Sequence, residues 1–296
     1  MIEKTIKSIR EEKNFSQKYV ADGILTSSQL SKIENGDQKL TVGHFIKILH
    51  RLCITFDEFC LFTEDEHILA RTESKHYIAE ILQNANLPRL KEGIKRMDNY
   101  HKKFNDIYFY HMSCVLMASH TLYETNNDYE KAREVLTPIS DYLNSVEAWF
   151  YYELTLFANV LFLYSSVDAV VVGKNALKRI NEDYERFKDY DIARSLLINL
   201  AIYSLDANQP MLAFEFSNKV LAFPQSTNYL YDILLAKIIN QIACFKLRNN
   251  EYDNNYLTNL VNTLKLLKLD DMYREIHDFM IKHNIDLAIV SKQYAN

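Results

Sequence analysis

The chain has 296 residues, enough for two domains, and its 48% hydrophobic and 25% charged residues are ordinary for a globular protein. Only 5 Gly and 4 Pro occur, which argues against many-stranded sheets and favours long helices. The net charge of −5 excludes nucleic-acid binding that rests on bulk positive charge.

The charge is unevenly spread along the chain. Nine Lys and Arg against six Asp and Glu give residues 1–51 a charge of +3, which leaves −8 for the remainder. A basic module on an acidic body is typical of a DNA-binding head carried by a domain with another task.

The sequence carries no signal for a membrane-spanning segment, a metal site or a disulfide framework. Cys53, Cys60, Cys114 and Cys244 form no CxxC pair, and the first residues lack the apolar core of a signal peptide. Residues 154–167, an apolar stretch without charge, are too short to span a bilayer. We expect a cytoplasmic protein with no membrane association, no cofactor and no metal.

Enzyme signatures are also missing. GxGxxG, P-loop, HExxH and GxSxG strings do not occur. His111 and His120 lie near Cys114, but these offsets do not place all three on one helical face. We therefore expect a protein that is not an enzyme.

The first 60 residues predict four or five short helices. Ile2, Ile6 and Ile9 share one helical face. Further helices are expected to begin at capping residues, namely Ser16, either Thr26 or Ser27, and Thr41. Two of these helices are joined by a very short turn, so a helix-turn-helix bundle is predicted over residues 1–65.

The third of these helices has a polar outer face of Ser27, Ser28, Gln29 and Lys32. Such side chains near a helix N-terminus can reach base edges in the major groove. The alternative is a helix face that merely meets solvent.

The strings SQKYVADGILTSSQLSKIENG (16–36) and ITFDEF (54–59) resemble the Cro/C1 type of helix-turn-helix and, more closely, the Rgg/GadR/MutR family of regulators. The resemblance implies base contacts by Ser27, Ser28 and Lys32. It implies phosphate contacts by Gln17 and Lys39 and an ion pair between Arg10 and Glu34. Serines cannot make bidentate base contacts, so readout is expected to depend on Gln29 and Lys32.

A 40-residue rhythm follows the head. Asn159, Asn199 and Asn240 are 40 and 41 residues apart, each in an apolar helical stretch, and small residues recur with the same period at Ala132, Gly173 and Ala213. Two helices per unit predict a tetratricopeptide-like α-solenoid over residues 70–296. We expect this part to be the regulatory and dimerisation domain. The whole chain is predicted to be all-α.

The recurring Asn residues have two interpretations. Each could bond a neighbouring loop or backbone, or the three could form a ladder that grips an extended peptide. The family resemblance implies the second, with a short hydrophobic signalling peptide in the concave groove. We expect Tyr152, Asn159, Arg194, Asn199, Tyr203 and Asn240 to contact it, although a core position or a surface ion pair is the ordinary alternative for Tyr152, Arg194 and Tyr203.

The leading hypothesis is a transcription regulator that binds double-stranded promoter DNA as a homodimer and responds to a peptide in quorum sensing. RNA polymerase is a further candidate partner. The alternatives are a DNA-binding regulator whose repeats bind a protein or small molecule, and an interaction scaffold with a vestigial head. Cys53 and Cys60, near the end of the head, are read either as buried thiols or as part of an intersubunit contact.

Overall fold

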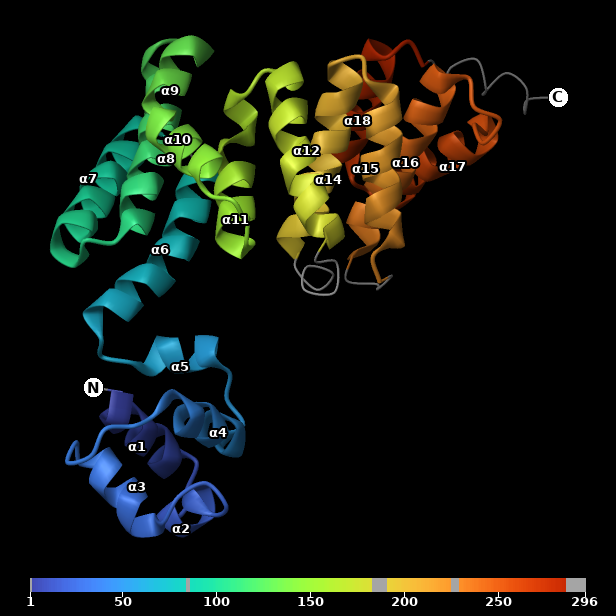
Figure 1. Cartoon of the computed structure of the whole chain (residues 1–296). Coiled ribbons are helices and arrows are strands. Elements are labelled where there is room, and N and C mark those ends of the chain that lie inside the picture. Colours follow the sequence, from blue (N-terminus) through green and yellow to red (C-terminus); the bar gives the residue numbers. More distant parts are fainter. Residues whose placement is uncertain (1, 84–85, 183–190, 225–228, 286–296) are drawn as a thin grey trace. The chain divides into compact units, whose positions relative to one another are not determined.

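A computed structural model of the chain describes residues 2–83, 86–182, 191–224 and 229–285, and every regular element within these ranges is a helix (Figure 1). The chain divides into two compact units, Met1–Asp128 and Tyr129–Asn296. The expected division at residues 65–70 falls at the start of a helix, Glu66–Gln83, inside the first unit. The all-α prediction is confirmed.

Five short helices open the first unit and share one core. Each supplies a buried side chain: Ile6, Val20, Leu30, Ile48 and Phe59 are all no more than 1% exposed. The helices are α1 (Ile2–Glu12), α2 (Gln17–Ala21), α3 (Ser27–Glu34), α4 (Val42–Leu52) and α5 (Phe56–Phe62).

Side-chain caps set where four of these helices begin. The hydroxyls of Ser16, Thr26, Thr41 and Thr55 each accept a hydrogen bond from a backbone amide in the first turn. The starts predicted at Ser16, Thr26 and Thr41 are confirmed. Gly36, directly after the C-cap of α3, has φ +83°, a left-handed conformation that L side chains rarely adopt and that ends a helix.

Three longer helices complete the first unit: α6 (Glu66–Gln83), α7 (Leu87–Phe104) and α8 (Ile107–Glu124). Pro88 lies in the first turn of α7, where its missing N–H costs nothing. Asp106 caps α8 and accepts hydrogen bonds from His67 (2.8 Å) and Arg71 (2.7 Å) on α6. Burial alone would raise the pKa of Asp106, but these bonds and one from the Tyr108 amide lower it on balance.

The second unit is a succession of helix pairs (Figure 1). The predicted second helix of each repeat is present, and one of them is split before Pro138, whose ring and missing N–H disfavour a continuous helix. The elements are α9 (Tyr129–Val135), α10 (Thr137–Ser145), α11 (Tyr151–Val160), the 3₁₀ turn η1 (Leu161–Leu163), α12 (Ser166–Glu182), α14 (Asp191–Asp206), α15 (Pro210–Ala222), α16 (Leu230–Leu247), α17 (Asn254–Leu266) and α18 (Asp270–Lys282).

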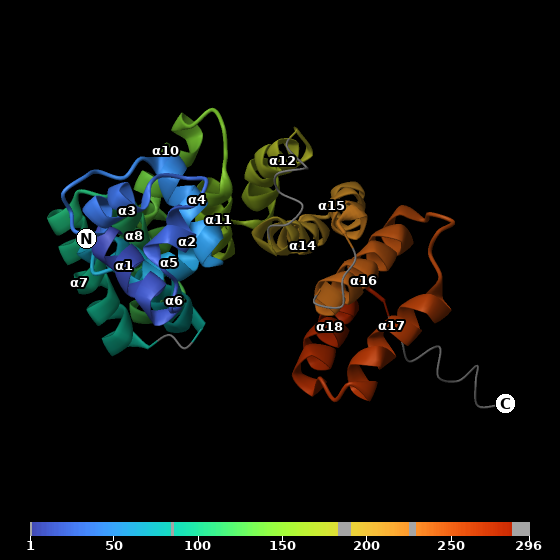
Figure 2. The same cartoon turned by 90° about the horizontal axis from the view of Figure 1, so that it is seen from below.

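The first helices of successive pairs pack on one another. Helix α14 contacts both α11 and α16, and α15 packs against α14 and α16. We call α11, α14, α16 and α18 the first-helix layer. Helices α16, α17 and α18 gather at the C-terminal end of the unit (Figure 2).

Small residues allow neighbouring helices to approach closely. Ala132 and Ala213 are fully buried, and a β-carbon on Gly173 would overlap the Leu200 side chain of α14. The small residues spaced about 40 apart therefore mark helix crossings. Among the described residues, no helix is long and apolar enough to cross a membrane.

Candidate DNA-binding and ligand-binding sites

The outer face of α3 is polar and exposed. Ser27, Ser28, Gln29 and Lys32 are all exposed there, while Leu30 and Ile33 hold the opposite side in the core. Lys39, in the connection between α3 and α4, is exposed as well. A helix held by its apolar side and polar outside has the form that enters a major groove.

Gln29 has a structural task that the sequence analysis did not assign. Its side-chain oxygen accepts a hydrogen bond from the Thr26 amide at 2.9 Å, while the Thr26 hydroxyl accepts one from the Gln29 amide at 3.1 Å. This reciprocal capping box stabilises the start of α3. Of the two long side chains expected to read bases, Lys32 is therefore the one not held by the helix start.

Arg10 and Glu34 form a buried ion pair between α1 and α3. The guanidinium donates to both carboxylate oxygens, at 2.6 and 2.8 Å, and the Glu34 side chain is fully buried. The bond to Glu34 raises the pKa of Arg10. Gln17 donates to the same carboxylate at 2.7 Å, so the structure places this residue, expected at a phosphate, in the ion-pair network.

Arg51 on α4 is a residue that sequence reasoning missed. It donates to the backbone oxygens of Tyr19 (2.7 Å), in α2, and Asp22 (2.9 Å), the C-cap of α2 where the turn to α3 begins. The partners are about thirty residues away, and no local pattern signals such a contact. Arg51 therefore holds the C-terminal end of α2 from outside the helix-turn-helix itself.

The two cysteines of the head differ in exposure. Cys60 on α5 is buried, and burial raises the pKa of its thiol. Cys53 is exposed and ends α4 with φ +53°. The reading of both as buried thiols is thus right for Cys60 and wrong for Cys53.

The described residues contain no group of three or more His, Cys, Asp or Glu that could hold a metal ion. His111 and Cys114 are both buried in α8, where burial lowers the pKa of His111 to about 4 and raises that of Cys114 to about 11. A neutral ring and a protonated thiol suit a helix core.

Asn159 and Asn199 occupy matching positions in the first-helix layer. Asn159 is half-buried on α11 and Asn199 is exposed on α14. Neither side chain bonds to another described residue, so both amides are available to a ligand.

Asn240 behaves differently from the other two Asn residues. It is 8% exposed on α16, and its amide nitrogen donates to the Ser217 hydroxyl (3.1 Å) and the Asn218 side-chain oxygen (3.0 Å) on α15. Both N–H groups join the second helix of one pair, α15, to the first helix of the next pair, α16. The prediction of Asn240 as a peptide contact is corrected, because buried polar groups take internal partners.

Arg194 also lies away from the predicted surface. It is 1% exposed on α14, and its guanidinium lies over the Tyr229 ring at 3.7 Å, with Asp232 at 3.9 Å. A residue five positions before Asn199 lies on the other side of the helix. The prediction that Arg194 contacts the peptide is therefore corrected. Burial raises the pKa of Asp232, and Arg194 opposes that rise.

The two predicted tyrosines are half-buried. The Tyr152 ring meets the Tyr142 ring edge-on at 6.0 Å, which ties α11 to α10. Tyr203 follows Asn199 by four residues on α14, and burial together with the Asp206 carboxylate raises its pKa. Of the two, Tyr203 shares the helical face of Asn199.

An apolar hollow of about 190 Å³ opens between α14, α16 and α18. Ile202 of α14 and Leu235 of α16 form part of its wall, and Tyr231, Met272 and Phe279 surround it. Sequence reasoning did not find it, because its walls come from helices about forty residues apart. The only hint was the apolar surface repeated on each first helix.

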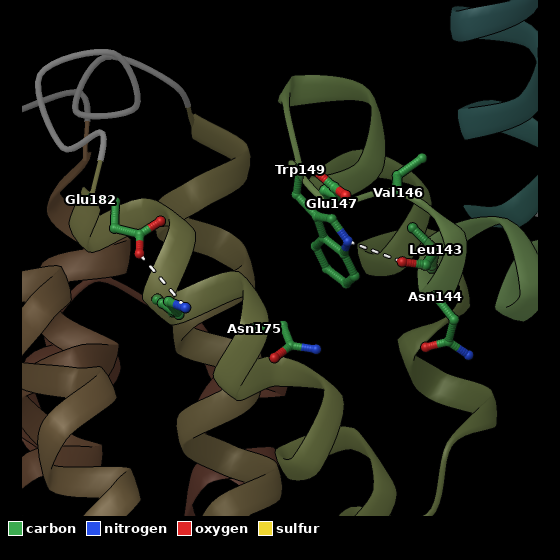
Figure 3. A pocket seen from close by; sticks show the side chains of 8 residues that line it. Leu143, Asn144, Val146, Glu147, Trp149, Asn175 and Glu182 are labelled. Carbon is green, nitrogen blue, oxygen red and sulfur yellow. Dashed lines mark hydrogen bonds and ion pairs between the residues drawn. The ribbon is translucent and has the colours of Figure 1, made fainter.

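A second hollow, of about 240 Å³, is polar and involves α10 and α12 (Figure 3). Asn144 and Asn175 line it from these two helices. The indole N–H of Trp149 donates to the Leu143 oxygen at 3.2 Å, and Lys178 pairs with Glu182 at 3.8 Å. This hollow is lined by second helices of their pairs and not by the first-helix layer. It also lacks the apolar wall expected of a peptide groove.

Comparison with known proteins adds family and fold. Residues 90–277 match the C-terminal domain of the HTH-type transcriptional regulator Rgg, and residues 6–59 match the helix-turn-helix family. Among solved structures, the SHP pheromone receptor Rgg2 of Streptococcus dysgalactiae is similar, with a TM-score of 0.70 and 20% identity over 95% of this chain and 99% of that one.

Two ligand-bound structures share the fold. PlcR of Bacillus thuringiensis in complex with the peptide PapR7 and DNA has a TM-score of 0.65 and 16% identity, over 93% of this chain and 98% of that one. The PrgX/cCF10 complex also has a TM-score of 0.65, with 18% identity over 95% and 99%. At these identities the likeness shows a shared fold.

Proposed function

The chain belongs to the Rgg family of helix-turn-helix transcriptional regulators, and on that premise we propose that a short signalling peptide, bound along the first-helix layer, controls its binding to promoter DNA. The observation that carries the proposal is the pair of unengaged amides, Asn159 and Asn199, at matching positions on α11 and α14. PlcR, which shares the fold, is described with both a peptide and DNA bound.

Residues 1–65 form the DNA-binding head in this proposal, and residues 70–296 the regulatory part. Ser27, Ser28 and Lys32 contact bases, while Lys39 and Gln17 contact phosphate. The protein acts by binding and not by catalysis, in the cytoplasm where its promoter lies. One helix-turn-helix makes few base contacts, so two copies bind paired half-sites.

The peptide acts through a population shift. A peptide that prefers one arrangement of the dimer favours that arrangement, and the change in the heads alters DNA binding or contact with RNA polymerase. Asn199 supplies both a donor and an acceptor for the backbone of an extended peptide.

DNA binding is tested by mobility shift on the promoter region beside the gene. Ser28→Ala with Lys32→Ala should weaken binding about 10-fold or more, since it removes two of the proposed base contacts. The control is Lys174→Ala, at an exposed lysine on α12. Unchanged binding by the double variant would remove α3 as the recognition helix.

Peptide control is tested with synthetic peptides encoded by short reading frames near the gene. One of them should change the DNA affinity of the wild-type protein, and Asn199→Ala should abolish that change. A response that survives Asn199→Ala would place the peptide elsewhere.

A further inference from the structure

The apolar hollow between α14, α16 and α18 has the size of a side-chain pocket. At about 190 Å³ it is smaller than the 300–1,000 Å³ or so typical of sites for whole small ligands. Ile238 and Ile239 form a buried floor, and Tyr231 stands at the opening with 46% of its surface exposed. Such a space suits one aliphatic side chain of a longer ligand.

The hollow adjoins the proposed peptide contact. Ile202, in its wall, follows Asn199 by three residues on α14 and so lies on the same face, about 4.5 Å further along the helix axis. An extended chain rises about 3.4 Å per residue. A peptide whose backbone meets Asn199 can therefore place a neighbouring side chain in the hollow.

Helix α18 is tied in place as one wall of the hollow. Lys282 and His283 at its end contact Asp206 at the end of α14, at 2.7 and 3.2 Å. These contacts bridge 76 and 77 residues of sequence between the first and last helices that line the hollow. A wall held before the ligand arrives lowers the cost of binding.

Glu275 of α18 is, among the described residues, the only charged one that lines the hollow. It is exposed, and within the described part of the chain no Lys, Arg or His pairs with it. Burial, with the carboxylates of Glu275 and Asp232 adding to it, raises the pKa of Tyr231 at the opening. The rim of an otherwise apolar pocket is therefore negative.

We propose that the hollow binds an aliphatic side chain of the signalling peptide while Glu275 binds a positively charged ammonium group next to it. The inference rests on the proposed function and adds the chemical class of the peptide: apolar with a cationic neighbour. The charge of −8 on the chain beyond residue 51 favours the approach of a cation over that of an anion.

The test uses four synthetic peptides that share the core Ile-Leu-Ile-Val. Three are acetylated and carry Lys, Gln or Glu before the core, and the fourth carries Gln and a free α-amino group. Each has fluorescein at the C-terminus, and binding to the full chain is followed by fluorescence polarisation. The Lys probe and the free-amine probe show whether a side chain or the N-terminus supplies the ammonium group.

We expect the wild-type protein to bind an ammonium probe about 10-fold more tightly than the Glu probe. Glu275→Gln should reduce that difference to below about 2-fold, and Glu275→Lys should reverse it. Glu215→Gln, at an exposed glutamate on α15 away from the hollow, is the matched control and should change nothing. Leu235→Trp, which fills the hollow, should weaken all four probes.

The inference falls if the Glu275 variants alter probe binding no more than Glu215→Gln does. It also falls if no probe binds and Leu235→Trp instead disrupts a dimer, since a second copy of the chain then occupies the hollow. Peptide control of DNA binding is tested separately from the pocket. If a gene-encoded peptide changes the DNA affinity of the wild type and of Glu275→Lys equally, the function holds and the pocket assignment does not.

Discussion

Arg10 and Glu34 are joined by two hydrogen bonds of 2.6 and 2.8 Å across 24 residues of sequence. They connect the first helix to the recognition helix, with the Glu34 side chain fully buried. The pair also holds Gln17 and the Phe15 backbone oxygen, so one charged cluster fixes three segments of the head.

Glu34→Ala should lower the free energy of unfolding of the head by about 3–5 kcal/mol, because it leaves a buried guanidinium without its partner. Urea unfolding followed by circular dichroism measures this. Glu11→Ala removes the exposed partner of the same Arg10 and should cost less than about 1 kcal/mol. Equal effects of the two variants would contradict the buried pair.

Gln29→Ala should destabilise the head by about 0.5–1 kcal/mol, because it removes one half of the capping box. Gln29→Glu keeps an acceptor for the Thr26 amide and should retain stability. The two variants separate capping from base reading. If Gln29→Glu changes the preferred base at one operator position, as a selection of binding sites would show, the residue also reads DNA.

Asn240→Ala should cost about 1–3 kcal/mol of stability, since it leaves the Ser217 and Asn218 oxygens without their donor. Asn199→Ala, at the equivalent sequence position but exposed, should change stability by less than about 0.5 kcal/mol. Thermal unfolding of both variants makes the comparison. A large cost at Asn199 would mean that its amide has a structural partner.

Gly173→Ala should destabilise the second unit by about 1–3 kcal/mol, because the added methyl overlaps Leu200 across the helix crossing. Gly43→Ala is the control: Gly43 lies in α4, no atom comes within 4 Å of the added carbon, and alanine favours the helix. A stable Gly173→Ala variant would show that Leu200 can move aside.

Stability should fall as the pH drops from about 6.5 to about 4. Burial lowers the pKa of His111 from 6.5 to about 4, so in this range the unfolded chain takes up a proton that the folded chain does not. The stabilisation is complete above pH 6.5 and is lost toward pH 4. It amounts to at most about 1.4 kcal/mol for each pH unit that separates the pKa values of the unfolded and folded chain.

His111→Gln should flatten this part of the stability curve, measured by urea unfolding at several pH values. His50→Gln, at an exposed histidine on α4, is the control. A slope that persists in His111→Gln would assign the pH dependence to another group.

The sequence by itself determined the helices and the places where they begin. Caps such as Ser16 and Thr41 act within one turn, and the small residues at 132, 173 and 213 mark crossings that recur with the repeat, so both can be read from local spacing. The recognition-helix face is local too, because residues one turn apart on a helix must share a side.

The tertiary structure decided which repeated polar residues meet solvent. Asn199 and Asn240 have equivalent places in the rhythm, yet only Asn240 faces donors and acceptors on its neighbouring helix. Periodicity gives the position of a residue within a helix pair but not how the neighbouring helices cover it. For the same reason the periodicity did not predict that Arg194 is buried. It also did not predict the hollow beside Glu275, which three helices far apart in sequence form together.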